Sequence, residues 1–272
     1  MTPFQAMILG LLQGLTEFLP VSSSGHLALS QALLKISHEG DISFEVFVHF
    51  GTFLSVLAAF RKEVVAIISS FLHVIQHPRQ ISGYYKTNEF FRLGILIGVG
   101  SIPAGIIGLR YENEVETLFS DPKLISVMLL VTGFILYLTR FSKPKEGVSV
   151  GLGSSILVGC AQAVAVIPGI SRSGSTISAG LFSGISRENA AKFSFLLAMP
   201  VIFGASVLKV FELTKSPPSS EKILTLSIGT VVAAISGYFA IQWLLNVLRK
   251  GRFSWFAYYC FAVGIVGILF IG

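Results

Sequence analysis

Long apolar stretches separated by short polar segments run along the whole chain. A helix needs about 20 mostly apolar residues to cross a bilayer, and six stretches meet that length or come close to it. They cover about 43–60, 89–109, 122–140, 187–211, 222–248 and 253–271. The pattern therefore predicts an all-α integral membrane protein with six transmembrane helices.

Two further hydrophobic stretches, 3–36 and 149–184, are each interrupted by a polar cluster rich in small residues, "PVSSSGH" in the first and "PGISRSGST" in the second. Irregular backbone at membrane depth is tolerated only where protein or a water-filled cavity surrounds it. We therefore expect two re-entrant helix–loop–helix hairpins that return to the side they entered. The segment 64–88 is expected to form an interfacial helix that ends at Pro78.

Composition and charge agree with a membrane protein. The chain has 272 residues, of which 53% are hydrophobic and 12% charged, whereas soluble domains have about 25% charged residues. Its formal charge of +6 comes largely from loops between spans, so it indicates topology rather than nucleic-acid binding. By the positive-inside rule the loops at 61–92, 140–146 and 249–252 are cytoplasmic, which places both termini and the loop at 110–123 outside.

The order of elements predicts an inverted-topology repeat. A hairpin and three spans fill residues 1–148, and a second hairpin and three spans fill 149–272. Because three is odd, the second half is inverted, with hairpin one on the outer side and hairpin two on the cytoplasmic side. A shift of 149 residues aligns Gly10 with Gly159, Gln13 with Gln162, Ser22 with Ser171, Ser24 with Ser173, Gly25 with Gly174 and Phe44 with Phe193.

Inverted repeats with broken helices place a binding site near the bilayer midplane, between the halves, so the two polar clusters are expected to meet. Two helix N-termini that carry hydroxyl groups and an arginine are expected to form an anion site. The forked N–H donors of an arginine guanidinium suit phosphate oxygens, so the expected anion is a phosphate group. The first half supplies Gln13, Glu17, Ser22, Ser23, Ser24, Gly25 and His26, and the second half supplies Ser171, Arg172, Ser173, Gly174, Ser175 and Thr176.

Each of these residues also has a purely structural interpretation. A serine in an apolar helix often bonds to a carbonyl one turn earlier, and Gly25 and Gly174 suit close helix packing. His26 is compatible with a structural contact, and Glu17 and Arg172 with a buried pair that holds the hairpins together. Burying an ionisable side chain inside a membrane is energetically costly, however, so its presence there favours a functional role.

The motifs "QGLTEFLPVSSSGH" (13–26) and "PGISRSGSTIS" (168–178) closely resemble the two signature regions of bacterial undecaprenyl-diphosphate phosphatases of the bacitracin-resistance type. The resemblance extends over nearly the whole chain, including "GSIPAG" (100–105) and "FSFLLAMP" (193–200). It implies hydrolysis of undecaprenyl diphosphate to undecaprenyl phosphate and inorganic phosphate. This reaction recycles the lipid carrier for cell-wall synthesis and confers bacitracin resistance.

The resemblance also implies roles for individual residues. Ser23 is expected to be the nucleophile and His26 its general base or acid, although an attack by His26 itself stays open. Arg172 is expected to hold the diphosphate, and Glu17 to orient His26 or hold a divalent cation, Mg or Ca. Gln13 occupies a family position that accepts Glu or Gln, which leaves one carboxylate. The expected substrate-binding residues are Gln13, Ser22, Ser24, Gly25, Ser171, Ser173, Gly174 and Thr176.

The resemblance implies that the protein lies in the bacterial plasma (inner) membrane, and the expected orientation of the hairpins places the reaction at the outer face of this membrane. A homodimer is compatible with the sequence. The inverted repeat by itself favours a transporter or lipid flippase, which stays an alternative. An intramembrane serine protease fits poorly, because Ser23 and His26 lie within one turn and an arginine comes from the other half. The likeness to type-2 phosphatidate phosphatases is attributed to convergence, since the chain has no K-x6-R-P motif.

Overall fold

The computed structural model describes residues 1–34, 43–119, 121–215 and 218–270, and this part of the chain consists of helices and their connections, with no strand. The α-helices are α1 (Pro3–Phe18), α2 (Ser23–Leu33), α3 (Ser43–Ala59), α4 (Arg61–Gln76), α5 (Ile81–Thr87), α6 (Glu89–Arg110), α7 (Glu112–Leu118), α8 (Pro122–Leu138), α9 (Leu152–Val164), α10 (Arg172–Phe182), α11 (Arg187–Lys215), α12 (Ser220–Arg249) and α13 (Phe256–Phe270). Short 3-10 helices cover Pro78–Gln80, Thr139–Phe141 and Phe253–Trp255.

Five helical segments of the described chain are long and apolar enough to cross a membrane: Glu89–Arg110, Pro122–Phe141, Arg187–Lys215, Ser220–Arg249 and Phe253–Phe270. A sixth is reached if α3 and α4, which are bent by 84° at their junction, count as one broken span. These segments lie where the sequence places six spans. The last residue of the final expected span, 271, lies outside the described residues, as do residues 35 and 36 of the first expected hairpin.

The two interrupted stretches each form a pair of short helices around a break. The first pair is α1 and α2, broken at residues 19–22, and the second is α9 and α10, broken at residues 165–171. At 1.5 Å per residue, α1 is only about 24 Å long and the other three are shorter, less than the roughly 30 Å of hydrocarbon in a bilayer. The breaks follow from the sequence, because Pro20 and Pro168 disfavour continuous helix, and Gly169 has a φ of 91°.

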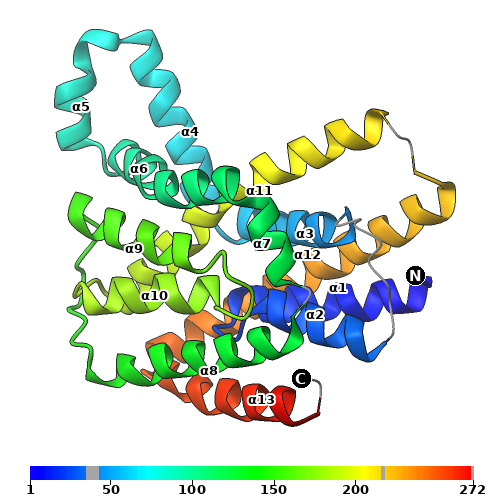
Figure 1. Ribbon diagram of the computed structural model, residues 1–272. Coiled ribbons are helices and arrows are strands. Elements are labelled where there is room, and N and C mark those ends of the chain that lie inside the picture. The colour runs from blue at the N-terminus through cyan, green and yellow to red at the C-terminus, as the bar shows by residue number, and fades with distance from the viewer. Residues whose placement is uncertain (35–42, 120, 216–217, 271–272) are drawn as a thin grey trace.

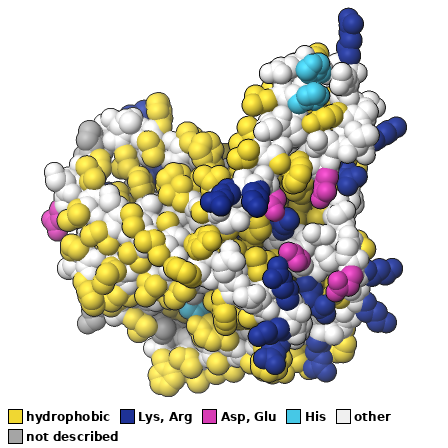
Figure 2. All heavy atoms as spheres, turned by 180° about the vertical axis from the view of Figure 1, so that it is seen from behind, with side chains coloured by type: hydrophobic (Ala, Val, Ile, Leu, Met, Phe, Trp, Pro, Cys, Tyr) yellow, Lys and Arg dark blue, Asp and Glu magenta, His cyan; other side chains and the backbone are white. Residues whose placement is uncertain are grey.

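The two pairs approach the middle of the molecule from opposite sides (Figure 1). The pair α1–α2 starts on the side that holds the N-terminus, whereas α9–α10 starts on the side that holds α4 and α5 (Figure 1). The connections rich in Lys and Arg, at 61–92, 140–146 and 249–252, all lie on this second side. Seen from behind, Lys and Arg gather along that side and much of the remaining face is hydrophobic (Figure 2).

Each helix pair packs against the opposite half of the chain through glycines. A Cβ atom added at Gly10 of α1 would lie 2.5 Å from the Gly229 oxygen in α12, and one added at Gly159 of α9 would lie 2.3 Å from the Gly100 oxygen in α6. Both values are below any normal contact, so only glycine permits these helices to approach so closely. The close packing holds α1 against α12 and α9 against α6.

The projecting arm formed by α4, the 3-10 helix at Pro78–Gln80 and α5 corresponds to the expected interfacial segment (Figure 1). The helix α4 ends at Gln76, two residues before Pro78. Only Ser70 and Val74 of α4 are buried, and its apolar side chains Val65, Ile68, Leu72 and Ile75 are more than half exposed. Such a helix suits the boundary between lipid and water.

Candidate active site

The two breaks meet in the interior of the molecule, as the sequence predicts. The Ser173 hydroxyl donates a hydrogen bond of 3.0 Å to the Leu19 carbonyl, which joins the start of α10 to the first break. A Cβ atom added at Gly25 would lie 3.4 Å from the Cα of Gly169 in the second break. The N-termini of α2 and α10 therefore lie next to each other, although almost 150 residues separate them in the sequence.

The two helix starts are capped in the same way. The Ser22 hydroxyl accepts a hydrogen bond of 3.3 Å from the Gly25 N–H, and the Ser171 hydroxyl accepts one of 3.0 Å from the Gly174 N–H. Ser22 has a φ of 66° and is the one described non-glycine residue with a positive φ; such a conformation costs of order 1–3 kcal/mol. The hydroxyl pairs Ser22–Ser24 and Ser171–Ser173 are each separated by 3.3 Å.

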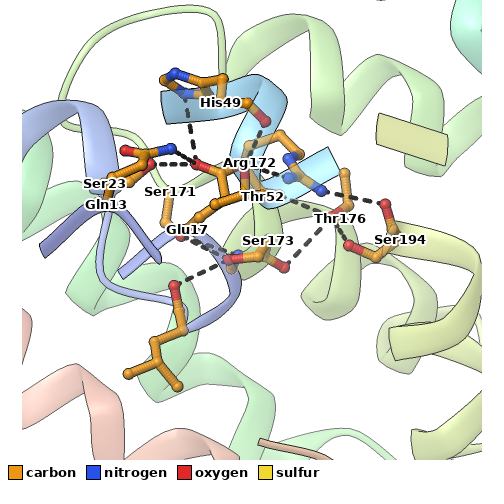
Figure 3. A network of polar contacts seen from close by, with 12 residues as sticks. Gln13, Glu17, Ser23, His49, Thr52, Ser171, Arg172, Ser173, Thr176 and Ser194 are labelled. Carbon is orange, nitrogen blue, oxygen red and sulfur yellow. Dashed lines mark hydrogen bonds and ion pairs between the residues drawn. The ribbon is translucent and has the colours of Figure 1, made fainter. Parts of the chain in front are cut away.

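The Glu17 carboxylate is the centre of a polar network between the halves (Figure 3). Its Oε2 accepts hydrogen bonds from the Ser23 hydroxyl at 2.5 Å and from Gln13 Nε2 at 3.0 Å, while Oε1 forms an ion pair with Arg172 Nη2 at 2.5 Å. The Glu17 side chain is only 5% exposed. The network thus brings together Gln13, Glu17, Ser23 and Arg172, four of the residues that the sequence singles out.

The structure adds His49 of α3 to this network. Its Nε2 lies 3.5 Å from Glu17 Oε2, and its Nδ1 lies 2.7 Å from the Glu45 carbonyl. A carbonyl oxygen only accepts hydrogen bonds, so Nδ1 carries a proton. The contact brings α3 to the same carboxylate that Ser23 and Arg172 reach.

Arg172 is fixed by α11 as well as by Glu17. Its Nη1 donates to the Ser194 carbonyl at 3.2 Å, and the Ser194 hydroxyl lies 2.6 Å from Thr176 Oγ1, which also donates to the Arg172 carbonyl at 2.7 Å. The guanidinium is thus aimed at the junction of the two helix pairs (Figure 3). Arginine presents five N–H donors, so part of its fork remains for a ligand.

His26 takes different partners from those expected. Its Nδ1 lies 2.8 Å from the Ser22 carbonyl and its Nε2 lies 2.8 Å from the Tyr259 hydroxyl, and the two rings are stacked at 5.6 Å. The carbonyl requires a proton on Nδ1, so in the neutral ring Nε2 accepts from Tyr259. Within the described residues, Ser23 and Glu17 are not among the hydrogen-bond partners of His26, and the contact expected between Glu17 and an imidazole is made by His49 instead.

Sequence reasoning missed His49, Ser194 and Tyr259. A signal existed for His49, because an ionisable residue within an apolar span is a functional candidate by default. Ser194 acts through its backbone carbonyl as well as its hydroxyl, and a carbonyl has no sequence signal. Tyr259 lies 233 residues from His26, so only the packing of α13 near α2 reveals the contact.

Gln13 and Glu17 present the side-chain oxygen atoms that a cation could use at this site. The Gln13 Oε1 atom is buried and has no hydrogen-bond partner among the described residues, and it belongs to the amide that bonds to Glu17. Carboxylate and amide oxygens are ligands that Mg²⁺ and Ca²⁺ prefer. The described residues contain no group of three or more His, Cys, Asp or Glu side chains placed to hold a metal, so the protein can offer a cation at most a few ligands here.

Comparison of the sequence with known proteins identifies a family. The curated relatives include proteins named undecaprenyl-diphosphatase from Desulforapulum autotrophicum, 46% identical over 98% of this chain and 97% of the relative, and from Salinibacter ruber, 44% identical over 98% and 99%. The relative from Halothermothrix orenii, with the same name, is 46% identical over 99% and 98%. The family described as bacitracin resistance protein BacA matches residues 6–266, and the chain belongs to this family.

Proposed function

We propose that the protein hydrolyses undecaprenyl diphosphate to undecaprenyl phosphate and inorganic phosphate. The relatives that share its full length carry the name of this activity. The observation that carries the proposal is the contact of one carboxylate, Glu17, with both the Ser23 hydroxyl and the Arg172 guanidinium. It supplies a nucleophile, a base and a phosphate-binding cation within one hydrogen-bonded unit.

The diphosphate is bound by charge and by helix N-termini. Arg172 offers its fork, and the first N–H groups of α2 and α10, which have no partner within their own helices, offer further donors. Ser22, Ser24, Gly25, Ser171, Ser173, Gly174 and Thr176 build and cap these helix starts. Phosphoryl transfer depends chiefly on positioning and charge neutralisation, which is what this arrangement provides.

Ser23 attacks the terminal phosphorus while Glu17 Oε2, 2.5 Å from the hydroxyl, takes its proton. The bond from this phosphorus to the bridging oxygen breaks, and undecaprenyl phosphate leaves with the bonding electrons and the proton from Glu17. Water then attacks the phosphoserine and gives its proton to Glu17. Ser23 recovers that proton as inorganic phosphate leaves.

Attack by His26 is the competing assignment. The Nε2 lone pair it would use faces the Tyr259 hydroxyl, which favours Ser23. Trapping the phosphorylated enzyme distinguishes attack by Ser23 from attack by His26, because a phosphoserine survives acid and a phosphohistidine does not. We assign His26 a positioning role at the first turn of α2, where it bonds to Ser22, the residue with the strained backbone.

A divalent cation, Mg or Ca, forms part of the proposal. Gln13 Oε1 and Glu17 would hold it, and waters and phosphate oxygens would complete its coordination. When bound, it would offset negative charge on the diphosphate.

We also propose that residues 1–148 and 149–272 are inverted repeats whose helix pairs are re-entrant hairpins. The matching caps at Ser22 and Ser171 and the matching glycine contacts at Gly10 and Gly159 support this proposal, since a shift of 149 residues relates both pairs. The basic connections on one side (Figure 1) support a cytoplasmic location for that side. The substrate then reaches the site from the outer face of the plasma membrane.

The experiment is phosphate release from undecaprenyl diphosphate by the purified protein in detergent. We expect turnover by the wild type and its loss in Ser23→Ala and Arg172→Ala. Ser183→Ala is the matched control, because the Ser183 hydroxyl donates to the Ala179 carbonyl one turn earlier in its own helix. Absence of turnover in the wild type, or equal turnover in all variants, would contradict the proposal.

Helix pairs that enter from opposite sides (Figure 1) are also typical of transporters, so a lipid flippase is the second candidate. Reconstituted vesicles separate the two functions. Movement of intact diphosphate headgroups between leaflets by Ser23→Ala, which cannot hydrolyse them, would show transport. Phosphate release without such movement supports the phosphatase alone.

A further inference from the structure

A groove between α3 and α11 lies beside the site. We propose that it binds the part of the isoprenoid chain nearest the diphosphate, an inference that rests on the proposed function. The groove encloses about 240 Å³, and Phe47, Phe50, Phe203, Val207 and Val210 form most of its wall. Within the mechanism this surface has no other role.

The two helices that form the groove run antiparallel. Phe60, near the end of α3, packs against Phe195, near the start of α11, with ring centroids 6.1 Å apart. Further along, Phe53 packs against Phe203 at 5.7 Å. The groove begins at this second contact and continues toward the start of α3. From Phe203 to Val210 it extends about 10 Å at 1.5 Å per residue.

The groove begins where the polar network ends. His49 lies three residues after Val46 and one before Phe50, both of which line the groove, and its other neighbour is the Glu17 carboxylate at 3.5 Å. The His49 side chain is 30% exposed, whereas that of Glu17 is 5% exposed. His49 therefore lies at the boundary between the buried headgroup site and the apolar groove. The opposite wall belongs to α11, which also reaches the site, because the carbonyl of Ser194 in this helix accepts a hydrogen bond from Arg172 of α10.

The wall has the chemistry of a hydrocarbon site. Among the described residues that line it, Ser206 is the one with a polar side chain. Its hydroxyl donates a hydrogen bond of 2.7 Å to the Ile202 carbonyl, which satisfies the donor. Three phenylalanine rings and three valines provide the remaining contacts. Any acyl chain fits such a surface, but only a chain attached to the bound diphosphate is held there by the headgroup site as well, so we assign the groove to the isoprenoid chain.

Photo-crosslinking tests the occupant. Val207 lines the groove, and the adjacent Leu208, 59% exposed, does not. Each is replaced in turn by p-benzoylphenylalanine in a Ser23→Ala background and irradiated with tritiated farnesyl diphosphate. We expect crosslinking at position 207 to exceed that at 208 several-fold, and undecaprenyl diphosphate but not phosphatidylglycerol to compete. Equal yields at both positions, or equal competition by phosphatidylglycerol, would overturn the assignment.

Steady-state kinetics provide a second test. Val207→Trp narrows the groove, so the KM for farnesyl diphosphate should rise by at least about tenfold with little change in kcat, while Leu208→Trp should leave both unchanged. Dimethylallyl diphosphate, whose chain is too short to fill the groove, should be insensitive to both substitutions. Equal effects of Val207→Trp on the two substrates would overturn the assignment. If the wild type hydrolyses neither, the proposed function fails, and the crosslinking result still decides the groove.

Discussion

Arg172 Nη2 and Glu17 Oε1 form an ion pair of 2.5 Å between residues 155 positions apart in the chain. The pair joins α10 of the second half to α1 of the first half, at the place where both helix pairs are broken. Both side chains are largely buried, and breaking a buried pair by removing one partner costs about 3–5 kcal/mol. The same contact therefore holds the two halves together and places the phosphate-binding fork beside Ser23.

Arg172→Lys tests the fork. Lysine keeps the charge opposite Glu17 but loses the planar, bidentate donor set. We expect kcat/KM for undecaprenyl diphosphate to fall by about 10³-fold, the lower end of the range for arginines that stabilise phosphoryl transfer, while the elution volume in gel filtration stays that of the wild type. Turnover close to the wild-type value would remove Arg172 from the site.

Glu17→Gln and Ser23→Ala test whether the carboxylate acts as the base for the hydroxyl. Each single variant should lose about 10²–10⁴-fold in kcat, the range for general-base catalysis. Since Ser23 and Glu17 act as one unit, the double variant should be no slower than the slower single variant. Multiplicative losses, measured as phosphate release, would show that they act independently.

His49→Phe tests the contact between His49 and Glu17. Phenylalanine keeps most of the side-chain volume but makes no polar contact with the carboxylate, so kcat/KM, measured as phosphate release, should fall by roughly tenfold. His77→Phe, a substitution at the exposed position that follows α4, should retain the wild-type rate. An equal loss in both variants would mean that the contact with Glu17 is not the cause.

Gly10→Ala and Gly159→Ala test the packing between the halves. The new methyl groups would meet the oxygens of Gly229 and Gly100 at 2.5 and 2.3 Å, and overpacking costs about 1–3 kcal/mol. Both variants should melt at a lower temperature in detergent. Gly98→Ala, where a Cβ atom has nothing within 4 Å, should match or exceed the wild-type Tm. A Tm unchanged in all three would mean that the close approach is not required.

Cysteine labelling tests the orientation in the membrane. In a Cys160→Ser background, which removes the exposed native thiol, Glu114→Cys should react with a membrane-impermeant maleimide in intact cells. Lys143→Cys, on the basic side, should react only after permeabilisation. The reverse pattern would place the site at the cytoplasmic face.

The length and period of the apolar stretches determined the helices, because a segment that crosses lipid must satisfy its backbone internally whatever surrounds it. For the same reason Pro20 and Pro168 marked the breaks, and the polar residues around them marked the site. Gln13, Glu17, Ser23 and Arg172 could be selected from the sequence, since buried ionisable and hydroxyl groups in apolar surroundings are costly without a function.

The sequence alone could not decide which groups touch. Ser23 and His26 are three residues apart on α2, yet Ser23 bonds to Glu17 of α1 and His26 bonds to Tyr259 of α13. His49 reached Glu17 only through the packing of α3 against α1. Local spacing fixes a residue's place on its own helix, whereas partners from other helices depend on how closely the helices approach, and here contacts such as Gly10 on Gly229 decided that.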